Sequence, residues 1–133
     1  MYTILLDSSN TKLAVGIAKD NKVLKSIIYE AWQEQSEHMI PELNNILEEF
    51  DVKREEIDDV MVAIGPGSYT GVRIAITIAK TMSYVLNIPV YPVSSLSVCP
   101  ILRLENRCWK EPWQCESAQI WVERKYMCLL LPI

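Results

Sequence analysis

The first 93 residues alternate between short apolar runs and amphipathic stretches. Three short apolar runs near the start are separated by polar clusters, and these predict an antiparallel three-stranded meander. Two later runs of strand length each follow a stretch with apolar residues at helical spacing. The predicted order is three strands, helix, strand, helix, strand, an α/β lobe with a mixed sheet. The predicted strands are residues 2–6, 13–18, 23–29, 59–64 and 90–93, and the predicted helices are 37–50 and 72–86.

The first predicted helix carries one apolar stripe that covers an arc of about 120°. Ser36 is its predicted N-cap. His38, the only histidine of the chain, projects away from the stripe and is expected in solvent. The stripe consists of Met39, Ile40, Leu43, Ile46, Leu47 and Phe50.

The second predicted helix is apolar over about 200°, roughly twice the width of an ordinary core-facing stripe. Such a helix has two faces to bury. One face covers the sheet, where Ala75 and Ala79 allow close approach, and the other needs a second helix from this chain or from a partner. The remaining polar strip consists of Arg73, Thr77, Lys80 and Tyr84.

A glycine-rich turn lies between the fourth predicted strand and the second helix. Gly65 and Gly67 permit positive φ angles and close backbone approach, and the following helix start offers free amide groups to an anion. Asp7, Ser8 and Ser9 follow the first strand and either hold a phosphate or a magnesium ion or only satisfy turn amides. The glycine spacing is neither a dinucleotide fingerprint nor a P-loop, so spacing alone leaves a simple tight turn equally open.

The string Gly-Pro-Gly-Ser-Tyr-Thr-Gly-Val-Arg-Ile at 65–74 resembles the signature of the bacterial TsaB (YeaZ) family. Ala75 stands where that family usually has glycine, and Gln35-Ser36-Glu37 stands where His-Ser-Glu is common. The resemblance covers residues 1 to about 97. It implies a ribonuclease-H-like mixed-sheet lobe of the actin/Hsp70/sugar-kinase (ASKHA) type, and a second lobe that should follow is missing or replaced.

Composition changes abruptly near residue 98. Residues 1–98 hold 8 Lys and Arg against 13 Asp and Glu, a net charge of −5, whereas residues 99–133 hold 5 against 4, a net of +1. All 4 cysteines lie beyond residue 98 at spacings that match no zinc pattern. We therefore predict a TsaB-like lobe at 1–98 and an atypical Cys/Trp-rich tail at 99–133, from a truncated or frame-shifted reading frame.

The resemblance implies a non-catalytic scaffold in the biosynthesis of tRNA N6-threonylcarbamoyladenosine (t6A). Such a subunit pairs with the catalytic paralogue TsaD, is joined by the ATPase TsaE, and meets tRNA only through the complex. We expect no catalytic residue, no metal site and no cofactor of its own, with ATP and magnesium at the level of the complex. Pairing with a second copy of the chain is the other arrangement. The predicted partner interface is Met39, Leu43, Val72, Ile74, Ala75, Ile76, Ile78, Ala79 and Met82.

Two other function classes remain as alternatives. An ATP-dependent kinase or ATPase of the same fold would use Asp7, Ser8, Ser9, Gly65 and Gly67 as phosphate contacts. A glycoprotease-type (M22) peptidase is disfavoured, because one histidine cannot form a paired-histidine metal site. The net charge of −4 argues against a large basic nucleic-acid surface. No apolar run reaches the length of a membrane span, and we expect a cytoplasmic protein.

Overall fold

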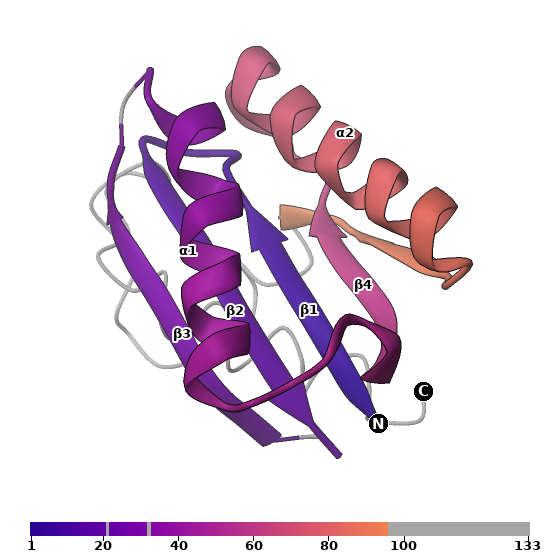
Figure 1. Ribbon diagram of the computed structural model, residues 1–133. Helices are drawn as coiled ribbons and strands as arrows, with labels where there is room; N and C mark the ends of the chain where they lie inside the picture. Colours follow the sequence, from indigo (N-terminus) through magenta and orange to yellow (C-terminus); the bar gives the residue numbers. More distant parts are fainter. Residues whose placement is uncertain (21, 32, 96–133) are drawn as a thin grey trace, which may run out of the picture.

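The computed structural model describes residues 1–20, 22–31 and 33–95, which form a five-stranded sheet and two helices (Figure 1). The strands are β1 (Tyr2–Asp7), β2 (Lys12–Lys19), β3 (Lys22–Glu30), β4 (Ile57–Ala63) and β5 (Val90–Val93). Their order across the sheet is β3-β2-β1-β4-β5. The first three strands are antiparallel neighbours, and β4 and β5 run parallel to β1. The predicted element order and mixed sheet are confirmed.

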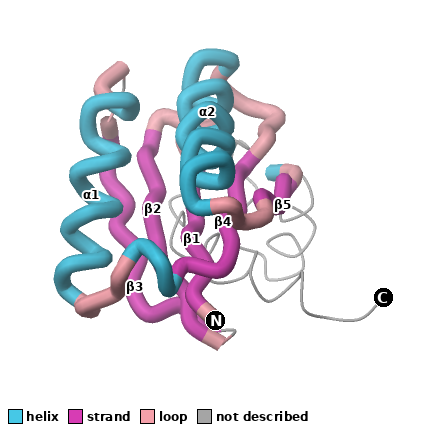
Figure 2. Tube along the Cα trace, turned by 45° about the vertical axis from the view of Figure 1, so that its right-hand side comes forward, coloured by secondary structure: helices cyan, strands magenta, loops and turns pink. Residues whose placement is uncertain are grey.

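Both helices lie on the same face of the sheet (Figures 1 and 2). Helix α1 (Gln35–Glu49) packs over β2, and α2 (Tyr69–Leu86) packs mainly over β4 and β1. A short 3-10 turn, η1 (Arg54–Glu56), leads into β4. β5 is an edge strand, as Pro92 within it predicts, because proline cannot donate to a neighbouring strand.

The main core lies between the sheet and the two helices, and strand alternation selects its members. Every second residue of a strand faces the same side, so one side of β1, β2 and β4 is almost entirely aliphatic. Against it pack the stripe of α1 and the small residues of α2. The fully buried members are Ile4, Leu6, Leu13, Val15, Ile17, Met39, Ile46, Val60, Ala75 and Ala79.

The opposite face of the sheet carries a smaller apolar cluster. Leu5, Ala14 and Ala18 form a second buried cluster there, with Val23, Ile28 and Met61 around it. Most of the aliphatic volume therefore lies on the side of the helices.

The predicted N-cap of α1 is wrong. The helix begins one residue before Ser36, with Glu34 at the cap position and no side-chain cap bond. The first turn is held instead by buried Gln35, whose Nε2 donates to the carbonyl oxygen of Asn10 at 2.8 Å. This contact joins residues 25 apart in the chain, so the capping pattern alone does not reveal it.

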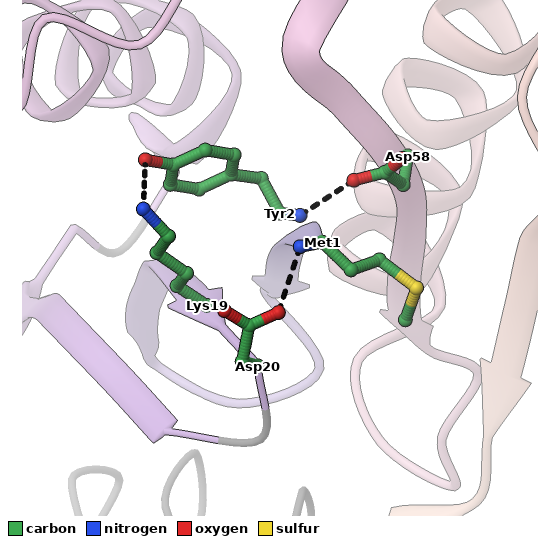
Figure 3. A network of polar contacts seen from close by, with 5 residues as sticks. All are labelled: Met1, Tyr2, Lys19, Asp20 and Asp58. Atoms are coloured by element: carbon green, nitrogen blue, oxygen red, sulfur yellow. Dashed lines mark hydrogen bonds and ion pairs between the residues drawn. The ribbon is translucent and has the colours of Figure 1, made fainter.

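A polar network closes the amino end of β1 (Figure 3). The N-terminal ammonium group of Met1 donates to Asp20 Oδ1 at 2.8 Å, and the Tyr2 amide donates to Asp58 Oδ2 at 2.7 Å. Lys19 Nζ donates to the Tyr2 hydroxyl at 3.0 Å. The ammonium contact lowers the pKa of the Asp20 carboxyl below its ordinary value. Charged and polar side chains therefore hold this end of the sheet together.

The predicted division at residues 98 and 99, the Cys/Trp-rich tail and the continuation of the chain after Ser95 lie outside the described residues.

Candidate functional site

The polar turn after β1 and the glycine loop after β4 meet at one edge of the sheet. The Ser68 amide donates to the Ser9 carbonyl oxygen at 2.7 Å, and Ser8 Oγ donates to the Gly71 carbonyl oxygen at 2.7 Å. Parallel strands β1 and β4 end at this edge, which explains why segments about 60 residues apart are in contact. The loop and the turn form one hydrogen-bonded unit.

Two glycines are required by this close approach. A Cβ atom on Gly67 would lie 2.1 Å from the Ser9 carbonyl oxygen, and one on Gly71 would lie 1.8 Å from the Ser8 carbonyl oxygen. Both distances are far below van der Waals contact. Gly65 has a φ of 87°, which favours glycine for a separate, conformational reason. The glycines of the signature string therefore have a structural role in packing the loop on the β1 turn.

The described contacts of Asp7, Ser8 and Ser9 are those of a structural turn. Asp7 Oδ1 accepts the Ser9 amide at 2.7 Å, and all three residues are buried. Ser68 Oγ accepts the Gly71 amide at 3.3 Å, so one of the amides at the start of α2 already has a partner. The structure brings together all five predicted phosphate contacts. Their use by a nucleotide stays a prediction.

Four of the nine predicted interface residues belong to the core. Met39 and Ala79 are 0 % exposed, and Leu43 and Ala75 are also buried. Because their side chains contact the sheet side, they offer no surface to a partner, and that part of the prediction needs correction. The other five are half-buried: Val72, Ile74, Ile76, Ile78 and Met82.

Contacts to β3 settle which way α1 is turned. Lys25 of β3 pairs with Glu49, and the Tyr29 ring meets the His38 ring edge-on with centroids 5.8 Å apart. The flank of α1 with His38 and Glu49 therefore lies over β3. The opposite flank, which carries Ile40, faces α2, and Ile40 is 50 % exposed.

The same geometry separates the two flanks of α2. Both helices run opposite to β1 over the same face of the sheet, so they are parallel to each other. Successive residues of a helix are about 100° apart around its axis, and residues at the same angle from the sheet-facing side therefore point in the same direction on both helices. The flank with Ile74, Ile78 and Val85 then faces α1, and the flank with Val72 and Ile76 faces the β5 edge. Val85 is 71 % exposed. We call Ile40, Ile74, Ile78 and Val85 the interhelical patch.

Sequence reasoning omitted several exposed apolar residues from the interface. Val85 belongs to the wide apolar arc of α2, and Ile40 belongs to the stripe of α1. The helical spacing of apolar residues could therefore have included both in the predicted interface. Tyr69 and Tyr84 are 75 % and 90 % exposed on the polar strip of α2, where Arg73, Thr77 and Lys80 are exposed as predicted.

Contrary to the prediction, His38 does not lie fully in solvent. It packs against Tyr29, and its Nε2 lies 3.4 Å from Glu34 Oε2. Within the described part of the chain, no three His, Cys, Asp or Glu side chains are grouped so that they would hold a metal ion. None of its helices has the length and apolar character needed to span a membrane.

Comparison with known proteins identifies the lobe. A family model described as "TsaD: tRNA N6-adenosine threonylcarbamoyltransferase" matches residues 26–108. The Bacillus subtilis "tRNA threonylcarbamoyladenosine biosynthesis protein TsaB" is 35% identical over 96 residues, which are 72% of this chain and 42% of the relative. The chain belongs to the family of this model, as one of its TsaB (YeaZ) proteins.

Structural comparison agrees with this TsaB assignment. YeaZ from Pseudomonas aeruginosa superposes with a TM-score of 0.71 and 26% identity, covering 80% of this chain and 50% of that one. A TsaB protein of Buchnera aphidicola (Schizaphis graminum) is 28% identical over 108 residues, 81% of this chain and 49% of its own. The chain thus spans about half the length of these TsaB relatives.

Proposed function

We propose that this chain is a non-catalytic scaffold subunit in the biosynthesis of t6A on tRNA. In this role it pairs through its two-helix face with a TsaD-like catalytic paralogue, and a TsaE-like ATPase joins the pair. The names of the TsaB relatives and of the matching family model support the pathway. The subunit would meet tRNA only through the complex. ATP and magnesium would belong to the complex, which would act in the cytoplasm.

The observation that carries the pairing proposal is the interhelical patch. Val85 and Ile40 keep half or more of their surface exposed, although they flank a fully packed core. Aliphatic side chains gathered between two parallel helices are a typical contact surface for another helical layer. The patch lies within residues 26–108, the segment matched by the TsaD model, so the proposed partner would carry a homologous lobe.

The hydrogen-bond partners of Asp7 and Ser8, and the position of His38, support the non-catalytic role. Asp7 is buried and accepts the Ser9 amide, and Ser8 is bonded to Gly71. His38 is on the β3 side of α1, away from both serines. A nucleophile needs a base within hydrogen-bond reach, and neither serine has a histidine there.

Co-purification with the TsaD-like protein of the same organism tests this proposal. Val85→Glu places a carboxylate in the interhelical patch without touching the core, and we expect it to weaken capture at least tenfold. Leu24→Glu is the matched control, because Leu24 is also exposed but lies on β3. Equal capture of both variants and the wild type would remove the patch from the interface.

A second measurement separates the scaffold from the ATPase alternative. A kinase or ATPase predicts a large rise in melting temperature of the isolated chain with magnesium and ATP, since ligands stabilise the state that binds them. The scaffold proposal predicts no shift for the chain alone. A shift abolished by Ser9→Ala would instead favour nucleotide binding at the glycine loop.

A further inference from the structure

The face of the sheet opposite the helices is buried, although neither described helix lies on it (Figures 1 and 2). Leu5 of the central strand β1 is only 6 % exposed. Its neighbours on this face are Gly16 of β2, which has no side chain, and Met61 of β4. A leucine with such neighbours on a bare sheet would keep much of its side chain in water. Another layer therefore covers this face.

The residues that β2 carries on this face allow the covering layer to approach closely. They are Ala14, Gly16 and Ala18, every second residue of the strand, and both alanines are buried. Small side chains leave room above the strand, and a glycine within a strand often marks the close approach of another backbone. Half-buried apolar side chains surround them: Val23, Ile28 and Met61. The surface to be covered is therefore apolar, and it is low over β2.

A buried carboxylate on the same face shows what the covering layer must supply. Asp59 lies opposite Thr3 in the β1–β4 pairing and two residues before Met61, so its side chain is on this face. It is 5 % exposed, and its Oδ1 has no hydrogen-bond partner among the described residues. A charged carboxylate is costly to bury without a donor. The cover must therefore combine apolar residues with a cationic or hydrogen-bond-donating side chain.

The continuation of the chain after Ser95 has this composition. Residues 96–133 are 38 residues (133 − 95), of which 21 are hydrophobic, and they hold 5 Lys and Arg against 4 Asp and Glu. Residues 1–95 hold 8 Lys and Arg against 13 Asp and Glu, a net charge of −5. Opposite net charges favour association of the two parts. The cationic residues of the continuation are Arg103, Arg107, Lys110, Arg124 and Lys125.

The chain leaves β5 within reach of this face. Tyr91 of β5 pairs with Met61, so its side chain points to the same side of the sheet. The Ser95 amide donates to the Gly65 carbonyl oxygen at 2.8 Å, which fixes the exit point beside the end of β4. From there Leu5 lies two strands across and four residues back, about 16 Å away at about 4.8 Å per strand and 3.3 Å per residue. About five extended residues span that distance.

We propose that residues 96–133 dock on the sheet face opposite the helices, with one of their cationic side chains meeting Asp59. Tethering favours this occupant over a second molecule, because a segment that starts so near the face is present at a high effective concentration. A second copy or another protein would have to displace it first. The two-helix face is untouched by this docking, so the inference does not depend on the proposed function.

The positions of the cysteines allow a direct test on the full chain. The native cysteines are Cys99, Cys108, Cys115 and Cys128, and residues 1–95 contain none. A cysteine introduced by Met61→Cys or Ile28→Cys therefore has partners only in the proposed cover. Thr77→Cys is the matched control, because Thr77 is exposed on α2, on the other side of the sheet.

Dilute protein is oxidised mildly and digested without reduction, and mass spectrometry measures how much of the introduced cysteine is joined to a native one. We expect Met61→Cys and Ile28→Cys to give at least fivefold more intramolecular disulfide than Thr77→Cys, because docking raises the local concentration of thiols. Equal yields for folded variants on both faces would overturn the inference. Disulfides that form mainly between chains would also overturn it, since they would place a second copy on the face.

Alkylation of the native cysteines tests the cover without a substitution on the face. In the wild type we expect iodoacetamide to label at least one of them tenfold or more slowly in buffer than in urea, and equal rates would overturn the inference. Asp59→Asn should speed this labelling at least threefold, because it leaves a cation of the cover unpaired. Glu55→Gln makes the same change of charge on the exposed η1 turn and should not. A folded Asp59→Asn variant that is labelled like the wild type would contradict the contact with Asp59.

Discussion

Replacing Gly71 by alanine gives opposite predictions from local and from tertiary reasoning. Gly71 lies inside α2, where alanine is intrinsically favoured over glycine by about 1 kcal/mol. The structure, however, places the new Cβ 1.8 Å from the Ser8 carbonyl oxygen, and ordinary contact begins at 3.4 Å. The difference, 3.4 − 1.8, means that two backbone segments must separate by about 1.6 Å.

The magnitude follows from three contributions. Overpacking against a rigid neighbour costs about 1–3 kcal/mol. This clash lies at the upper end, because neither the new Cβ nor the Ser8 carbonyl oxygen can move without moving the backbone. Moving the segments also breaks the Ser8 Oγ–Gly71 O hydrogen bond, which contributes about 1 kcal/mol. Helix propensity returns about 1 kcal/mol. The net destabilisation of Gly71→Ala is about 2–3 kcal/mol, or a fall of roughly 10–20 °C in Tm for a lobe of this size.

Urea unfolding of the full chain followed by far-UV circular dichroism measures this change. Thr77→Ala is the control, because Thr77 is exposed on the same helix and its substitution should stay within about 0.5 kcal/mol. A Gly71→Ala variant as stable as the wild type, or more stable, would show that the loop does not need its close approach to the β1 turn.

Three further predictions concern the core and the titrating groups. Ile46→Ala removes a fully buried side chain of α1 and should cost about 2–5 kcal/mol by the same urea assay, whereas a loss below 1 kcal/mol would place Ile46 outside the core. The pKa of Asp20 is lowered by the Met1 ammonium group, so its contribution to stability is present above the ordinary value of 3.8 and is lost as pH falls through the folded-state pKa. Asp20→Asn should therefore flatten the acid limb of a Tm-versus-pH curve, and an unchanged limb would contradict the contact. Burial, with the Glu42 carboxylate nearby, raises the pKa of Tyr29 above its ordinary value of 10.0, so the fold loses stability as pH rises above that value. Tyr29→Phe should lessen this loss in the alkaline limb of the same curve, and an unchanged alkaline limb would contradict the shift.

The order and type of the elements were determined by the sequence, because they depend on local periodicity. Alternating apolar residues in β2 and the stripe from Met39 to Leu47 each bury one side only when the chain adopts a strand or a helix. Pro92 limited β5 to an edge position or placed the proline at a strand end, since proline has no N–H to donate in a central strand, and the structure has β5 at the edge. The signature string pointed to the family.

The tertiary structure decided which apolar residues remain outside. A hydrophobic arc on α2 shows that much surface must be covered but not what covers it. The sheet buries Ala75 and Ala79 and leaves Val85 exposed, and the contacts of α1 with β3 turn Ile40 towards α2. The need for glycine at 67 and 71 comes from Ser9 and Ser8, about 60 residues earlier in the chain. Contacts between residues so far apart in the chain arise only when parallel β1 and β4 end at the same edge, and no local pattern encodes them.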